Sequence, residues 1–291
     1  MNDLSNLQPK HEFFIGIDSD GCAFPSMELK HKECFIPEII RHFGLQSISK
    51  YTRESAEFVN LYSSWRGANR FLALLKVMEL LEKRSEVRDS LVKIPNFNKL
   101  KIWCKEESNL GNPTLIEKIK KTKDSELQKI LEWSTAVNAA VEKMVFNLPP
   151  FSQVTKVLEM VKPKADIAVV SATPTDVLER EWKEHKIDQY VQVIAGQEMG
   201  NKKEHLIALT RNKYPSEKIL MIGDALGDLR AVKSVGGLFF PIKPGQEEKS
   251  WKLFLEEGLN QFFDGSYLGT NEDNNIKEFN DLLPDEPDWI T

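Results

Sequence analysis

Five short apolar runs limit what this chain of 291 residues can fold into. They lie at 13–17, 167–170, 191–194, 219–222 and 238–240. Helix-length amphipathic stretches separate each of the four later runs from the next. Because strands that are apolar throughout are buried on both faces, this alternation predicts an α/β fold, a Rossmann-like, doubly wound parallel sheet covered by helices. Such sheets bind ligands outside the carboxyl ends of their strands.

The segment between the first two runs has a different pattern. Its apolar residues recur at helical spacing, with proline and glycine breaks and without a strand-like run. We therefore expect a mainly α-helical domain at 23–150, inserted into an α/β core formed by 1–22 and 151–291. In the core, 246–263 is expected to be a further helix. The polar, acidic end from Asn271 is expected to have little structure.

Composition excludes several classes of protein. Hydrophobic residues make up 41% and charged residues 29%, which is typical of a folded globular protein and not of a disordered one. The net charge of −5 argues against non-specific binding to nucleic acid or to an anionic membrane. No apolar run is long enough to span a membrane, and the polar start of the chain has no secretory signal. Three cysteines without metal-ligand spacing favour the reducing cytoplasm.

Two pairs of acids follow two of the predicted strands. Asp18 and Asp20 come after the first run, and alternate residues of an extended segment point the same way, so the two carboxylates can converge. Asp224 and Asp228 come after 219–222 and lie one helical turn apart. Either pair alone is equally consistent with a solvated loop or a helix cap. Together, at the ends of parallel strands, they favour a Mg²⁺ site, since Mg²⁺ prefers carboxylate oxygens, water and substrate phosphate.

Two further segments carry groups suited to a phosphate. Ser171 and Thr173 follow 167–170 and precede Pro174, and a hydroxyl beside free helical N–H groups can receive a phosphate. Lys202 and Lys203 open another predicted helix, where a lysine can offset charge on a transferring phosphoryl group. Taken singly, the first segment is more typical of a plain helix N-cap, and the second is no more than is common for surface lysines.

The order of these four segments resembles the haloacid dehalogenase superfamily. The resemblance covers the whole predicted α/β core: Asp18-x-Asp20-Gly21, then Ser171, then Lys202 or Lys203, then Gly223-Asp224-x-x-x-Asp228. The helical segment lies where that superfamily inserts its C1-type cap. It is similar to the phosphatase and phosphomutase branch that includes β-phosphoglucomutase.

The resemblance implies a role for each residue that acts on the phosphate. Asp18 would attack phosphorus and form an aspartyl-phosphate. Asp20 would protonate the leaving oxygen and then activate the water that hydrolyses the intermediate. Ser171 would bind a phosphoryl oxygen, with Thr173 as a further substrate-binding hydroxyl. Lys202 would neutralise Asp18 and the phosphate, and it is preferred to Lys203 because it directly follows a Gly-Asn turn.

The resemblance also implies the Mg²⁺ ligands. They would be the carboxylate of Asp18, the backbone carbonyl of Asp20, the carboxylate of Asp224, and Asp228 directly or through water. The three carboxylates carry three negative charges, which Mg²⁺ and Lys202 together balance.

In the helical domain, a glycine interrupts the helical pattern within Trp65–Arg70. An aromatic side chain and two guanidinium groups flank this break, and we expect Arg66 and Arg70 to bind the substrate. The alternative is that both arginines belong to a solvated helix face.

The resulting expectation is a cytoplasmic, Mg²⁺-dependent phosphatase that acts on a small phosphorylated metabolite through an aspartyl-phosphate, as a monomer or homodimer. A phosphomutase of the β-phosphoglucomutase type is the alternative. Phosphonatase chemistry is disfavoured because Asp20 is present. A phospho-acceptor signalling protein and a non-catalytic binding protein are remoter alternatives, because the acids occur in the opposite order to a receiver domain and none of the four is missing.

Overall fold

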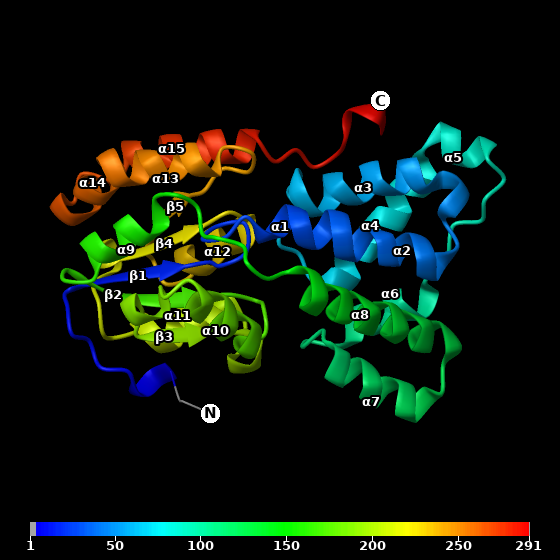
Figure 1. The fold of residues 1–291 in the computed structure, drawn as a ribbon, viewed down its shortest axis with the longest axis horizontal. Helices are drawn as coiled ribbons and strands as arrows, with labels where there is room; N and C mark the ends of the chain where they lie inside the picture. Colours follow the sequence, from blue (N-terminus) through cyan, green and yellow to red (C-terminus); the bar gives the residue numbers. More distant parts are fainter. Residues whose placement is uncertain (1–3, 291) are drawn as a thin grey trace. The chain divides into compact units, whose positions relative to one another are not determined.

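The computed structural model describes residues 4–290, which divide into two compact units (Figure 1). The sheet unit comprises 4–27 and 147–283, and the helical unit comprises 28–146 and 284–290. The chain therefore leaves the sheet unit soon after its first strand and returns to it before the second.

The sheet unit is built on one five-stranded sheet in the order β3-β2-β1-β4-β5, with every neighbouring pair parallel. The strands are β1 (Phe13–Ile17), β2 (Ala165–Val170), β3 (Val193–Ala195), β4 (Ile219–Gly223) and β5 (Leu238–Pro241). Ile17, the last residue of β1, pairs with Val169 on one side and Ile222 on the other. The segments that follow these three strands therefore begin at the same edge of the sheet. This edge includes the point where the strand order reverses, which is where such sheets bind ligands.

Successive residues of the strands alternate between two apolar cores, one on each face of the sheet. Ile15, Ile167 and Leu220 belong to one core, while Phe14, Ala168 and Met221 belong to the other. The first core includes side chains of α9 (Val154–Val161), α13 (Glu247–Leu253) and α14 (Leu259–Asp264), and the second those of α11 (Lys202–Thr210), α12 (Leu226–Lys233) and α15 (Thr270–Asp281). Helix α10 (Thr175–Glu184) contributes Trp182 to the first core. The predicted doubly wound α/β fold is confirmed.

The helical unit contains helices around a separate apolar core. Helix α1 (Ser26–Leu29) leads into it, and the others are α2 (Ile36–Phe43), α3 (Ser49–Leu61), α4 (Arg70–Lys83), α5 (Ser85–Asp89), α6 (Asn98–Glu106), α7 (Asn112–Thr122) and α8 (Ser125–Met144). Two π-helical turns occur, at Lys30–Phe35 between α1 and α2 and at Phe254–Gly258 between α13 and α14. The predicted interruption of the helical pattern near Trp65–Arg70 corresponds to the break at 62–69 between α3 and α4.

The C-terminal end differs from the prediction in two ways. Residues 270–281 form α15, whose Phe279 is fully buried against Phe239 of β5, so the expectation of little structure was wrong. A few apolar residues in a polar segment suffice for a helix when a sheet face is there to bury them. Residues 284–290 then group with the helical unit, not with the 151–291 core to which they were assigned.

In the helical unit, this tail packs on α3 and α4. The ring of Trp289 contacts Phe58, and the guanidinium of Arg84 lies 4.4 Å from the centroid of the same ring. Across the described residues 4–290, no helix is long and apolar enough to cross a bilayer. Cys22, Cys34 and Cys104 are free thiols.

Candidate functional site

Three buried carboxylates meet at the carboxyl edge of the sheet. Asp18 directly follows β1, Asp224 directly follows β4, and Asp228 lies in the first turn of α12. Each offers one carboxylate oxygen within 4.8 Å of the others, and their exposed fractions are 5%, 1% and 0%. Asp228 also accepts a hydrogen bond from the backbone N–H of Ala225, so it caps α12 while it faces the other two acids. We call these residues the three-carboxylate group.

Lys202 is the cation of this site. Its Nζ donates to Oδ2 of Asp18 at 2.6 Å and to Oδ1 of Asp228 at 2.5 Å. Asn201 caps α11 through a capping box with Glu204, which places Lys202 at the first helical position. A lysine is unfavourable at the positive end of a helix, so the neighbouring acids stabilise an otherwise poor choice of residue. Lys203, the alternative lysine, is exposed.

The electrostatics of the group favour a divalent cation. Burial opposes the charge of Lys202, but the pairing with Asp18 and Asp228 outweighs it and raises the pKa of the ammonium above its ordinary value. Burial also raises the pKa of Asp228 to about 6, against the opposing effect of Lys202. Three carboxylates and one ammonium leave two negative charges in a buried place, which is costly unless a cation is bound. An all-oxygen donor set of this kind fits Mg²⁺.

Asp20 lies beside this group but outside it. Its Oδ2 accepts a hydrogen bond from Thr173 Oγ1 at 2.7 Å, and its Oδ1 accepts one from the hydroxyl of Ser26. The carboxylate of Asp20 is not one of the three that converge. The predicted ligation by its backbone carbonyl stays a prediction.

The loop that carries both acids is a tight, buried turn. The carbonyl of Ser19 accepts hydrogen bonds from the N–H groups of Ala23 and Phe24, each at 2.9 Å. Gly21 has a φ of +74°, a backbone conformation that costs glycine little and other residues more. The thiol of Cys22 is fully buried beneath this turn, and burial raises its pKa well above the ordinary value, so it is not a reactive thiolate.

Ser171 follows β2 and is buried. Its N–H donates to the carbonyl of Ala195 in β3, and its hydroxyl accepts from the N–H of Thr173 at 3.3 Å.

The structure brings together six predicted residues of the sheet unit. Asp18 and Lys202 lie with Asp224 and Asp228, and Asp20 lies with Thr173. The Thr173 hydroxyl donates to Asp20. Substrate binding by Thr173 and by Ser171 stays a prediction.

Arg66 and Arg70 have contacts inside the helical unit. Arg66 is buried and donates from Nη1 to the carbonyl of Leu61 at 2.9 Å. Arg70 donates from Nη1 to the Ser134 hydroxyl at 3.0 Å and to Asn138 Oδ1 at 2.7 Å, and its guanidinium lies over the Phe35 ring. These contacts anchor α8 to the start of α4. The alternative of a solvated helix face does not apply to Arg66, which is buried, and a role of either arginine in substrate binding stays a prediction.

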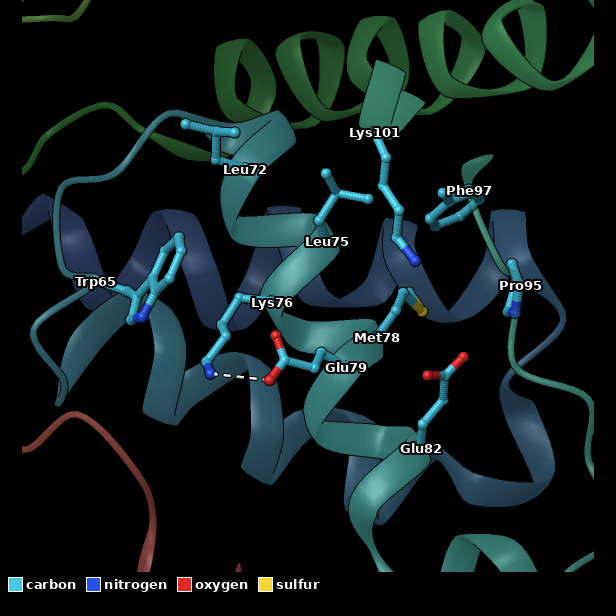
Figure 2. A pocket seen from close by; sticks show the side chains of 10 residues that line it. All are labelled: Trp65, Leu72, Leu75, Lys76, Met78, Glu79, Glu82, Pro95, Phe97 and Lys101. Atoms are coloured by element: carbon cyan, nitrogen blue, oxygen red, sulfur yellow. Dashed lines mark hydrogen bonds and ion pairs between the residues drawn. The ribbon is translucent and has the colours of Figure 1, made fainter. Parts of the chain in front are cut away.

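A separate cavity of about 210 Å³ lies within the helical unit (Figure 2). Its walls include Trp65, Leu75 and Met78, and Lys76 is paired there with Glu79 at 3.2 Å. The lining residues include none of the predicted site residues. The chemistry-bearing groups are therefore those of the sheet edge.

Sequence reasoning did not find three residues that contact the acids or their loop. Ser26 donates to Asp20, the N–H of Ser19 donates to Asp18 Oδ1, and the Trp182 indole donates to the Ser19 hydroxyl. Ser26 and Trp182 lie 6 and 163 residues from their partners, and no periodicity of the sequence relates them. The sequence signal for such a contact was the position of Ser19 between the two acids. In an extended segment its side chain points away from theirs and toward the interior, where a hydroxyl needs a partner.

A family model of haloacid dehalogenase-like hydrolases matches residues 90–240, just over half of the chain. The chain belongs to this family. Among solved structures, it is similar to a haloacid dehalogenase-like hydrolase from Bacteroides fragilis, with 14% identity, 83% of this chain and 93% of that chain covered, and a TM-score of 0.50.

It also resembles a hydrolase from Pseudomonas syringae, with 14% identity, 82% and 90% coverage and a TM-score of 0.45. A predicted phosphoglycolate phosphatase from Haemophilus somnus matches with 17% identity, 80% of this chain and 86% of that chain covered, and a TM-score of 0.43. At these identities the likeness concerns the fold alone. No curated protein matches the chain.

Proposed function

We propose that this haloacid dehalogenase-like hydrolase is a Mg²⁺-dependent phosphatase that hydrolyses small phosphate monoesters through an aspartyl-phosphate. One observation carries the proposal: a carboxylate paired with a lysine, Asp18, lies two residues before a carboxylate that accepts hydrogen bonds from two hydroxyls, Asp20. The two acids have different surroundings, and such a division is typical of paired acids with different roles.

Asp18 is suited to be the nucleophile. Lys202 donates a hydrogen bond to its Oδ2, and a divalent cation bound by the three-carboxylate group would offset the charge of an approaching phosphate dianion. In the first step a carboxylate oxygen of Asp18 forms a bond to phosphorus, and the bond from phosphorus to the leaving oxygen breaks. When bound, Mg²⁺ supplies the positive charge that orients the phosphoryl oxygens and stabilises their developing charge.

Asp20 is suited to carry the proton. In its neutral form it gives a proton to the leaving oxygen. As a carboxylate it then takes a proton from a water whose oxygen bonds to phosphorus, while the bond from phosphorus to the Asp18 oxygen breaks and phosphate is released. The hydroxyls of Thr173 and Ser26 donate to it, and a hydroxyl can donate to a carboxylate and accept from a carboxylic acid.

A phosphate-release assay tests the proposal. A panel of sugar phosphates, nucleotides and phosphorylated acids is incubated with the protein in Mg²⁺ or in EDTA, with Asp18→Asn as the matched variant. We expect release in Mg²⁺ only, and none from Asp18→Asn. Release that survives EDTA or Asp18→Asn contradicts the mechanism. Interconversion of sugar-phosphate isomers without release would instead assign a phosphomutase.

A further inference from the structure

Two buried polar groups of the sheet unit are paired with each other and are not used by the proposed chemistry. Nε1 of Trp182 donates to Oγ of Ser19 at 3.0 Å, and both residues are 0% exposed. Ser19 is the residue between the two site acids. A buried indole N–H and a buried hydroxyl each need a partner, and here each satisfies the other.

This pair is one hydrogen bond away from the nucleophile. The backbone N–H of Ser19 donates to Oδ1 of Asp18 at 2.7 Å, while Lys202 donates to Oδ2. Both carboxylate oxygens of Asp18 therefore accept a hydrogen bond, one from Lys202 and the other from the backbone N–H of Ser19. The side chain of Ser19 is in turn bonded to Trp182. A hydroxyl rotates easily, and the hydrogen bond from the rigid, buried indole restrains the Ser19 side chain, in addition to the two backbone hydrogen bonds that the Ser19 carbonyl accepts.

The segment that leads into the helix of Trp182 contacts Asp20. Helix α10 begins two residues after Thr173, whose hydroxyl donates to Asp20, and Trp182 lies in its last turn. The edge of the Trp182 ring packs against Phe24, which closes the same loop. Helix α10 and the residues just before it thus contact the loop at both Ser19 and Asp20.

We propose that Trp182, acting through Ser19, is a positioning residue that sets the direction of the Asp18 carboxylate for attack on phosphorus. The inference rests on the proposed function and adds to it a residue that does not touch the substrate. Its physical basis is that a nucleophile displaced by about 1 Å can lose about 100-fold in rate.

The chain offers a matched control in Trp251. Its indole is also 0% exposed and donates to the same loop, at the carbonyl of Cys22 and at 2.7 Å. Trp251 therefore holds the end of the loop without the link through Ser19 to Asp18. Replacing either tryptophan by phenylalanine keeps an aromatic ring and removes the donor.

The first experiment is a pair of double-mutant cycles on the full chain, with kcat and KM for p-nitrophenyl phosphate and with Tm for each variant. We expect Trp182→Phe and Ser19→Ala each to lower kcat about tenfold with KM within about twofold, and the double variant to lose no more than either. Trp251→Phe combined with Ser19→Ala is expected to multiply the two single effects. Multiplicative losses for Trp182→Phe with Ser19→Ala, or a lower Tm with unchanged kcat, overturn the proposal.

The second experiment needs neither turnover nor metal. The indole N–H signals of Trp182 and Trp251 are assigned in ¹H–¹⁵N spectra by their loss in the phenylalanine variants. Asp18→Asn is expected to shift the Trp182 signal and leave that of Trp251 in place. An unshifted Trp182 signal overturns the positioning role. If the wild type releases no phosphate from any ester but the Trp182 signal shifts, the proposed function fails and the link to Asp18 stands.

Discussion

Nζ of Lys202 lies 2.6 Å from Oδ2 of Asp18, although 184 residues separate them in the chain. The sheet produces this contact. Asp18 directly follows the central strand β1, and Lys202 begins the helix after the edge strand β3, so the parallel order β3-β2-β1 directs both segments to the same edge. Because the helical unit is inserted between these strands, the distance along the sequence is long while the distance in space is short.

Asp18→Asn is expected to lower kcat by at least about 1000-fold, because an amide is a poor nucleophile toward phosphorus. The variant should also form no covalent phosphoprotein, which intact-mass measurement after rapid acid quenching detects. Asp176→Asn, at an exposed position of α10, is the matched control and should keep full activity. Phosphoprotein formed by Asp18→Asn would assign the nucleophile to another residue.

Lys202→Met is expected to lower kcat about 100-fold and to cost about 3 kcal/mol of stability in EDTA, because it leaves three buried carboxylates without their ammonium. Mg²⁺ should restore much of that stability, since the cation replaces the lost charge. Tm in EDTA and in Mg²⁺ measures this. Lys203→Met changes the exposed neighbour and should alter neither quantity. Equal effects of the two substitutions would remove the role assigned to Lys202.

Thr173→Val is expected to lower kcat about tenfold with little change in KM, because it removes a hydroxyl donor from Asp20 without removing the acid. Thr175→Val is the matched control, since the Thr175 hydroxyl donates to Glu198 instead. Steady-state kinetics of both variants on one substrate decides the matter. If Thr175→Val loses as much kcat as Thr173→Val, the loop as a whole and not the bond to Asp20 is responsible.

The pKa of Asp228, raised by burial to about 6, predicts a pH dependence of stability. In EDTA the folded protein keeps a proton on Asp228 up to about pH 6, whereas the unfolded chain loses it near about pH 4. The folded state binds more protons between these values, so this residue's contribution to stability falls as pH rises through that window. Mg²⁺ competes with the proton, and its stabilising effect should therefore grow over the same range.

Urea unfolding between pH 4.5 and pH 7, in steps of about half a pH unit, measures how the free energy of unfolding depends on pH in EDTA and in Mg²⁺. Asp228→Asn holds no titrating group at this position, and its EDTA profile should be flatter than that of the wild type. A slope that persists unchanged in Asp228→Asn would assign the pH dependence to another group.

The tail of the chain predicts a stability effect in the helical unit. Trp289→Ala removes a ring that contacts Phe58 and the buried guanidinium of Arg84, and we expect a loss of about 2 kcal/mol in the free energy of unfolding. Leu282→Ala, at a largely exposed residue just before the tail, should lose less than about 0.5 kcal/mol. Equal losses would show that the tail does not stabilise the helical unit.

Strands and their acids were predictable because both leave local signals. A strand buried on two faces has to be apolar throughout, and the five runs match β1 to β5 closely. The C-terminal helix was not predictable in this way. Its polar composition conceals Phe279 and Leu283, whose burial depends on a sheet face that exists only after the fold has formed.

The sequence by itself determined the α/β class and the placement of four acids after two strands, because a hydrophobic pattern depends only on residues that are close together in the sequence. Only the tertiary structure decided that Asp228 and not Asp20 joins Asp18 and Asp224, that Lys202 and not Lys203 faces them, and that Trp182 holds Ser19. These choices depend on the register of parallel strands and on the direction of single side chains. Both are set by packing between segments far apart in the sequence, and no local pattern records them.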